Sequence, residues 1–329
     1  MSTTELESQI QSASATIANL LSTVERVVVG QREMVERLIL GLLTGGHVLL
    51  EGVPGLAKTL TVNTLARAIH ARFARIQFTP DLLPADLIGT LIYNPRDGTF
   101  TPRKGPVFAN IVLADEINRA TPKTQSALLE AMQEHRVTVG RTTYTIEEPY
   151  FVLATQNPLE MEGTYPLPEA QLDRFFFKLM VPFPSREDLH TIIERTTTDY
   201  AAKVEPVVSA EDILGMQKLV RTVPVARHVQ DYAVRLLQAT HPDGPDAPEK
   251  VRRFARVGAS PRGAQAVLLA AKIRALFEGR FAASVDDVKA SAAPALRHRM
   301  LLNFEGEAEG VKTDDCIREI LEELPEAKT

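Results

Sequence analysis

The fold is decided by the stretch Val48-Leu49-Leu50-Glu51-Gly52-Val53-Pro54-Gly55-Leu56-Ala57-Lys58-Thr59. It runs from an apolar segment typical of a buried strand, through a loop with two glycines, into a helical pattern. Glycines allow successive backbone N–H groups to converge on phosphate oxygens, and the N-terminus of the following helix adds its positive end. In such a loop Lys58 reaches the β- and γ-phosphates, and the Thr59 hydroxyl binds Mg²⁺. The stretch therefore predicts a phosphate-binding loop.

One position departs from the strict loop pattern, which has glycine before the lysine where this chain has Ala57. Alanine fits there if its φ is negative, so the interpretation stands. The alternative is a chance turn between a strand and a helix. It is weakened by Lys58 and Thr59, which follow the Val/Leu strand in the register that a phosphate-binding loop requires.

Composition restricts the class of protein. The 329 residues are 44% hydrophobic and 24% charged, enough for two domains with a substantial core and incompatible with wholesale disorder. The single cysteine, Cys316, excludes an intrachain disulfide and indicates a reducing compartment, so we expect a cytoplasmic protein in which this thiol is simply packed or exposed. We expect no membrane span and no signal peptide. The net charge of −5 does not favour a general nucleic-acid binder.

The pattern of apolar runs indicates two domains. β-rich runs alternate with helical patterns and are found at 47–51, 75–78, 111–115, 151–155 and 175–181. Runs that are apolar on both faces are typical of a parallel sheet covered by helices. After Pro182 the β-rich runs stop, and helical patterns follow at 209–221, 228–240, 261–279 and 284–292. We therefore predict an N-terminal helical segment over 1–26, an α/β core over 27–190 and a helical domain over 205–329.

Two adjacent acids stand at the end of the strand predicted at 111–115. Asp115 and Glu116 stand at its C-terminal end, which is the edge where parallel sheets bind ligands. There Asp115 would complete the Mg²⁺ shell, while Glu116, pointing the other way, would polarise an attacking water. Alone, the pair serves equally well to cap the next helix. Together with a phosphate-binding loop one strand earlier, the pair favours catalysis.

Three further polar residues stand at element ends. Asn157 follows the strand predicted at 151–155 and could orient the same water, and Arg174 precedes the run at 175–181. Arg262 lies at a predicted helix start, where a cation opposes the helix dipole, so local helix stability does not explain it. Each residue alone is typical of a surface, but their order and spacing favour a shared site.

These motifs together resemble the MoxR branch of the AAA+ ATPases, over about residues 25–300. The matching stretches, besides the loop, are Val28-Val-Gly-Gln31, Ile76-Gln-Phe-Thr-Pro-Asp-Leu-Leu-Pro84, Leu113-Ala-Asp-Glu-Ile-Asn-Arg119, Ala154-Thr-Gln-Asn157, Glu169-Ala-Gln-Leu-Asp-Arg-Phe175 and Gly258-Ala-Ser-Pro-Arg262. The resemblance implies an α/β fold, in which a five-stranded parallel αβα sandwich is followed by a smaller all-α lid. It also makes Ala57 this branch's own variant of the loop.

The resemblance implies roles for single residues. Asn157 matches sensor 1, Arg174 the arginine finger and Arg262 sensor 2, while Arg119 would face the neighbouring subunit. For Arg174 the alternative is a local ion pair with Asp173 or Glu169. The residues expected to bind ATP or ADP are Val29, Gly30, Gly52, Val53, Pro54, Gly55, Leu56, Ala57, Lys58, Thr59, Leu60 and Asp115.

Two segments read as hairpin inserts in the α/β core. Residues 90–101 contain an Asp97-Gly98 turn and resemble the helix-2 insert of this clade. Residues 136–146 alternate apolar and polar side chains around a Gly-Arg turn and resemble the pre-sensor-1 hairpin. The alternative for both is a solvent-exposed structural hairpin that contacts no substrate.

As a whole, the resemblance implies a Mg²⁺-dependent ATP hydrolase that works as a ring of identical subunits, expected to be hexameric. It would remodel or mature a protein client together with a partner that carries a von Willebrand factor A domain. One alternative is a nucleic-acid or chelatase-type motor subunit, against which the hairpins form no dense basic stripe with aromatic residues. The other is a nucleotide switch without productive turnover, against which Glu116 and Arg174 argue.

Overall fold

The structure is a computed structural model that describes residues 3–53, 55–96, 98–157, 163–199 and 202–326. The chain divides by its contacts into two compact units. The first, here called the α/β unit, comprises Ala18–Pro168 and Leu179–Gly215. The second, here called the lid unit, comprises Met1–Ile17, Glu169–Lys178 and Met216–Thr329.

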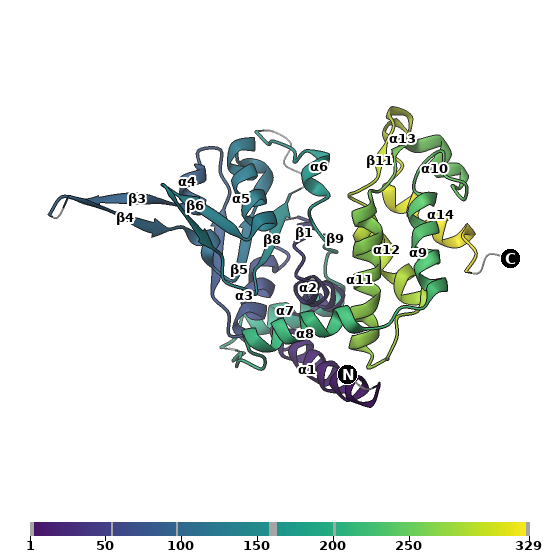
Figure 1. Cartoon of the computed structure of the whole chain (residues 1–329), viewed down its shortest axis with the longest axis horizontal. Coiled ribbons are helices and arrows are strands. Elements are labelled where there is room, and N and C mark those ends of the chain that lie inside the picture. The colour runs from purple at the N-terminus through teal and green to yellow at the C-terminus, as the bar shows by residue number, and fades with distance from the viewer. Residues whose placement is uncertain (1–2, 54, 97, 158–162, 200–201, 327–329) are drawn as a thin grey trace. The chain divides into compact units, whose positions relative to one another are not determined.

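The elements follow one another along the chain as Figure 1 labels them. As far as Thr222 they are α1 Thr3–Glu25, α2 Arg32–Thr44, β1 Val48–Glu51, α3 Lys58–Ala68, β2 Phe73–Gln77, α4 Pro84–Ile88, β3 Gly89–Asn94, β4 Thr99–Lys104, η1 Pro106–Phe108, β5 Ile111–Asp115, η2 Ile117–Arg119, α5 Pro122–Glu134, β6 Arg136–Val139, β7 Thr142–Thr145, β8 Phe151–Gln156, α6 Glu169–Leu172, β9 Phe177–Met180, α7 Arg186–Thr196 and α8 Ala210–Thr222. The remaining elements are α9 Arg227–Ala239, α10 Glu249–Phe254, β10 Ala255–Val257, α11 Pro261–Phe277, α12 Val285–Leu296, β11 Leu301–Leu302, α13 Phe304–Ala308 and α14 Thr313–Glu323.

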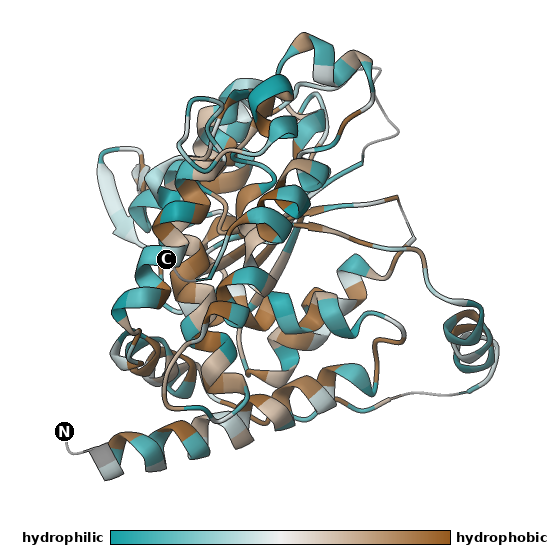
Figure 2. Cartoon of the chain, turned by 90° about the vertical axis from the view of Figure 1, so that its right-hand side faces the viewer, coloured by the Kyte–Doolittle hydropathy of each residue, from teal (hydrophilic) through white to brown (hydrophobic). Residues whose placement is uncertain are grey.

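Five strands form one sheet in the order β2-β5-β8-β1-β9. The pairs β2–β5, β5–β8 and β1–β8 are parallel. Residues 48–50, 111–114 and 151–155 are completely or almost completely buried, and Figure 2 colours the strands in the middle of the sheet mostly as hydrophobic. Burial of the apolar faces of α2 and α3, including Leu38 and Val62, adds to this core. The predicted α/β core with a parallel sheet is confirmed.

The register of this sheet brings polar residues to one edge. Gln77 of β2 lies beside Asp115 of β5, and Leu50 of β1 lies beside Thr155 of β8. Because parallel strands end at the same side of a sheet, the residues that follow β1, β5 and β8 converge there.

Both predicted hairpins are present in the α/β unit. Strands β3 and β4 pair antiparallel over 89–104, and β6 pairs antiparallel with β7 over 136–145. Figure 1 shows β3 and β4 extending away from the sheet. The expected turn at Asp97-Gly98 falls partly outside the described residues, because the structure does not describe Asp97.

The lid unit is mostly helical and contains one short antiparallel pair of strands. Strands β10 and β11 pair between Ala255–Val257 and Leu301–Leu302, so the prediction that β structure stops after Pro182 is wrong here. Strands of three and two residues are too short to show alternation, which is why the sequence pattern missed them.

Two segments remote from the C-terminal helices in sequence group with the lid unit. In the first, the Gln11 side chain donates to the Gly279 carbonyl at 2.9 Å, and Ser14 donates to the Phe277 carbonyl at 2.8 Å. The second is Glu169–Lys178, whose contacts with the lid helices are given below. Among the described residues, no helix combines the length and apolar character that crossing a bilayer requires.

Candidate nucleotide-binding site

The phosphate-binding loop leads directly into α3. Gly55 has φ 84, a conformation that glycine adopts without steric cost. Ala57, the residue before Lys58, has φ 55 and ψ 17, which is the left-handed region. The expectation that alanine is accommodated by a negative φ is therefore wrong. The loop keeps the turn that glycine normally makes, at a cost of about 1–2 kcal/mol for an L-residue.

Lys58 folds back over the loop. Its Nζ donates to the Gly52 carbonyl at 2.6 Å. Burial lowers the pKa of Lys58, while the carboxylates of Asp115, Glu116 and Glu51 act to raise it. The Lys58 ammonium group therefore lies at the loop, close to three carboxylates. Phosphate oxygens of a bound nucleotide would replace the Gly52 carbonyl as its hydrogen-bond acceptors.

A cavity of about 360 Å³ joins the loop to the ends of the strands. It is lined by Gly55, Leu56, Ala57, Lys58, Thr59, Leu60, Arg75, Gln77, Asp115, Glu116, Thr155 and Asn157. The structure thus brings most of the predicted loop residues together with both acids and the predicted sensor 1 residue. Gly52 and Val53 lie at the start of the loop, outside this lining, and Pro54 lies outside the described residues.

The two acids are held by Thr155 on the neighbouring strand. Its Oγ1 donates to Asp115 Oδ1 at 2.7 Å and accepts from the backbone N–H of Glu116 at 2.8 Å. Glu116 has φ 57 and ψ 51, so its backbone is in the left-handed region although it is not glycine. Non-glycine residues in this region cost about 1–3 kcal/mol and cluster at functional sites.

Two residues of β2 contact the acids, and the sequence pattern did not single them out. Arg75 forms an ion pair with Asp115, with Nη2 at 2.6 Å from Oδ2, and donates to Gln77 Oε1 at 2.9 Å. Gln77 in turn donates to Glu116 Oε2 at 2.8 Å. The same oxygen accepts from Arg119 Nη1 at 3.1 Å. A polar chain therefore connects both acids, and only the register of β2 against β5 reveals it.

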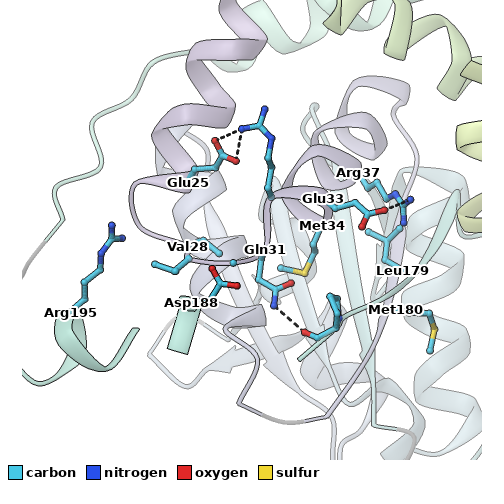
Figure 3. Close-up of a pocket in the computed structure, with 14 residues that line it drawn as sticks. Glu25, Val28, Gln31, Glu33, Met34, Arg37, Leu179, Met180, Asp188 and Arg195 are labelled. Carbon is cyan, nitrogen blue, oxygen red and sulfur yellow. Dashed lines mark hydrogen bonds and ion pairs between the residues drawn. The ribbon is translucent and has the colours of Figure 1, made fainter. Parts of the chain in front are cut away.

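Val29 and Gly30 line a second cavity of the α/β unit, of about 500 Å³, shown in Figure 3. Gly30 has φ 72, and a Cβ there would lie 2.5 Å from the Asp188 carboxyl carbon, so glycine is required on both counts. Gln31 is 3% exposed and donates through Nε2 to the Pro182 carbonyl at 3.2 Å. Its Oε1 has no hydrogen-bond partner within the described part of the chain.

The two predicted arginines belong to the lid unit. Arg174 lies just after α6, and Arg262 is at the first turn of α11. The carboxylates considered as local partners of Arg174 are bound by other arginines. Asp173 pairs with Arg299 at 2.9 Å, and Glu169 pairs with Arg256 at 3.0 Å.

Comparison with known proteins agrees with this architecture. Residues 47–177 match the ATPase family associated with various cellular activities (AAA), and residues 249–320 match the AAA lid domain. The chain is 44% identical to Chaperone MoxR1 of Mycobacterium tuberculosis, covering 93% of this chain and 81% of that protein. It is 46% identical to YeaC of Bacillus subtilis over 91% of both chains. A crystal structure of a candidate ATPase from Cytophaga hutchinsonii superposes with a TM-score of 0.93, at 45% identity and 99% coverage of both chains.

The fold and the matches define an AAA+ ATPase, with an α/β core followed by a helical lid. Within that class, the chain belongs to the MoxR family.

Proposed function

We propose that this MoxR-family protein hydrolyses ATP in a Mg²⁺-dependent reaction at the cavity between the loop and the strand ends. The observation that carries the proposal is that Lys58 and Thr59 of the loop line the same cavity as the carboxylates of Asp115 and Glu116. This is the division of labour that phosphoryl transfer to water requires, with cations and amides at the phosphates and a carboxylate at the water.

The residues at the cavity fit Mg²⁺. Mg²⁺ prefers oxygen ligands and keeps positions for phosphate oxygens and waters, so one carboxylate and one hydroxyl suffice from the protein. Thr59 and Asp115 would supply these, and no larger group of acidic, His or Cys ligands occurs among the described residues. When bound, the ion would neutralise charge on the β- and γ-phosphates.

The chain's own residues would bind the phosphates and activate the water. Lys58 and the loop amides would stabilise the charge that develops on the γ-phosphate. Glu116 would accept a hydrogen bond from the attacking water, and Asn157, which is 7% exposed and lines the same cavity, would help to orient it. Val29 and Gly30 would lie beside the adenine.

Arg174 and Arg262 extend the site beyond one subunit. In this proposal Arg174 acts as an arginine finger on the γ-phosphate of a neighbouring subunit, and Arg262 acts as sensor 2 of nucleotide state. The finger requires a ring of identical subunits, for which we propose a hexamer, with Arg119 facing the neighbour. The ring would remodel or mature a protein client in the cytoplasm with a von Willebrand factor A domain partner. The chaperone name of the relative MoxR1 supports the client-remodelling part.

Phosphate release and nucleotide binding test the proposal. Lys58→Ala should lose nucleotide binding, whereas Glu116→Gln should bind ATP and lose hydrolysis, by about 10²-fold or more. Glu130→Gln is the matched control, because Glu130 is an exposed carboxylate on α5. Glu116→Gln that turns over ATP at the wild-type rate would remove Glu116 from the catalytic role.

A further inference from the structure

The segment that carries Arg174 is fastened to the lid helices by its neighbour Asp173. Both oxygens of this carboxylate accept hydrogen bonds from the Ser260 hydroxyl, at 2.9 and 3.1 Å. Oδ1 also accepts from Arg299 Nε at 2.9 Å, and Oδ2 lies 3.6 Å from Arg262 Nη1. One side chain therefore connects the residue next to Arg174 with two separate parts of the lid unit.

Arg299 makes this connection rigid. Its side chain is 3% exposed, and its guanidinium donates to the carbonyls of Asp173, Phe175 and Phe176 at 3.1, 2.7 and 3.2 Å. A further N–H donates to the Ala295 carbonyl of α12. Burial lowers the pKa of Arg299, and the Asp173 carboxylate opposes that shift. A planar donor fork that holds three carbonyls of one short segment leaves that segment little freedom to move by itself.

Ser260 connects the same carboxylate to the start of α11. It is the N-cap residue of this helix, and its Oγ accepts from the backbone N–H of Arg262 at 3.3 Å while it donates to Asp173. The carboxylate of Asp173, next to Arg174, is thus hydrogen-bonded to the residue that caps the N-terminus of α11.

We propose that Asp173 is a positioning residue, which with Arg299 and Ser260 fixes the Arg174 segment to the N-terminus of α11, so that Arg174 moves with the lid unit. The proposal rests on the proposed roles of Arg174 and Arg262. Its consequence is that the nucleotide state read by Arg262 in one subunit sets the position of the finger that this subunit presents to its neighbour. Such a rigid element is a physical basis for coupling between successive sites.

Two variants weaken the connection and one matched control leaves it intact. Asp173→Asn keeps the size of the side chain but loses the charge that pairs with Arg299. Ser260→Ala removes the hydroxyl that donates to Asp173, together with an N-cap. The control is Ser284→Ala, because Ser284 caps α12 in the same unit and bonds Asp287 instead.

Mixed assemblies separate positioning from general instability. Asp173→Asn should assemble, bind mant-ATP as the wild type does and lose turnover by about tenfold or more. Mixed with Glu116→Gln subunits, which supply an intact finger, it should regain activity. Mixed with Arg174→Ala it should regain none, since neither subunit then supplies a well-placed finger. Ser260→Ala should behave in the same way with a smaller loss, and Ser284→Ala should hydrolyse ATP at the wild-type rate.

Hydrogen exchange tests the connection to the lid directly. When ATPγS is added to assembled wild-type protein, exchange in residues 169–178 should slow together with exchange at the start of α11. In Ser260→Ala the change at α11 should remain, while the change in 169–178 should shrink. If Asp173→Asn fails to fold, hydrogen exchange and the turnover of Ser260→Ala still test whether the Arg174 segment is coupled to α11.

Several results would overturn the coupling. These are wild-type turnover in Ser260→Ala and Asp173→Asn, no recovery of Asp173→Asn by Glu116→Gln, or exchange in 169–178 that does not respond to ATPγS. Failure of the proposed function looks different. In that case the wild type releases no phosphate, or mixtures of Arg174→Ala with Glu116→Gln stay inactive although both assemble.

Discussion

Gln77 donates a hydrogen bond from Nε2 to Glu116 Oε2 over 2.8 Å, across the pair of strands β2 and β5. The bond lies next to a backbone that is already in the left-handed region at Glu116. Because Arg119 binds the same oxygen, Oε1 is the carboxylate oxygen left by these two contacts to face a water. Gln77 thus orients the residue proposed to activate the nucleophile.

Removal of the hydrogen bond from Gln77 to Glu116 should impair ATP hydrolysis more than ATP binding. We expect Gln77→Ala to lower kcat about tenfold, since a misdirected base is a positional defect, and to leave the Kd for ATP unchanged. Steady-state phosphate release and mant-ATP titration would measure the two quantities. A rise in kcat would contradict this view, because it would show that Gln77 restrains Glu116 in an unproductive orientation.

Ala57 provides a test of backbone strain. Its φ of 55 is unfavourable for alanine and open to glycine. Ala57→Gly should therefore stabilise the folded loop by up to about 1 kcal/mol, which corresponds to a rise in Tm of ~2–4 °C for a domain of this size. Ala57→Val, with a β-branched side chain, should lower Tm and weaken ATP binding. A Tm that is equal in all three proteins would show that the loop relaxes around this position.

His47 should make the α/β unit sensitive to acid. It is fully buried, with Nε2 at 3.0 Å from the Met132 carbonyl oxygen and Nδ1 accepting from the Val152 N–H. Burial lowers the pKa of His47 to about 4 from 6.5. Between pH 4 and 6.5, His47 is therefore protonated in the unfolded chain and neutral in the folded one. The free energy of unfolding is thus highest above pH 6.5 and falls as the pH drops towards 4.

At pH 5 this single site should cost about 2 kcal/mol of unfolding free energy relative to pH 7.5. Denaturant unfolding at the two pH values would measure the loss. His47→Gln lacks the titrating group and should lose correspondingly less, although it is less stable at both pH values. An identical pH dependence in the two proteins would exclude His47 as the cause.

The sequence predicted all five strands of the sheet, but it did not predict the contacts that side chains of the edge strand β2 make. Strands β1, β5 and β8 are buried on both faces and read as unbroken apolar runs. Strand β2 is an edge strand with exposed positions, so Arg75 and Gln77 had no pattern to distinguish them from surface residues. Their roles depend on register, which a single sequence does not state.

Contacts within the lid unit show a second limit of what a single sequence predicts. The helix start at Arg262 was predicted from the local sequence, because the signals that begin a helix are local. The contact of Ser260 with Asp173 joins positions 87 residues apart, and the contact of Arg299 with Asp173 joins positions 126 residues apart. No local rule predicts such pairs. For the same reason the grouping of Glu169–Lys178 with the lid unit appears only in the structure.

Arg75 forms an ion pair with the carboxylate of Asp115, which we propose as a Mg²⁺ ligand. Both its Nε and its Nη2 donate to Asp115 Oδ2, at 3.2 and 2.6 Å, and its side chain is 48% exposed. A cation bound to this oxygen reduces the negative charge that Asp115 offers to the metal, by an amount that solvent screening keeps modest.

Arg75→Met should therefore lower the free Mg²⁺ concentration at which hydrolysis is half-maximal, by roughly threefold to tenfold. The measurement is ATP hydrolysis against free Mg²⁺ at saturating ATP. Arg72→Met is the matched control, because Arg72 lies just before β2 and pairs with Glu147 instead. It should leave the Mg²⁺ dependence unchanged. If Arg75→Met needs more Mg²⁺ than the wild type, Arg75 holds Asp115 in the orientation that binds the metal and does not compete with the metal for it.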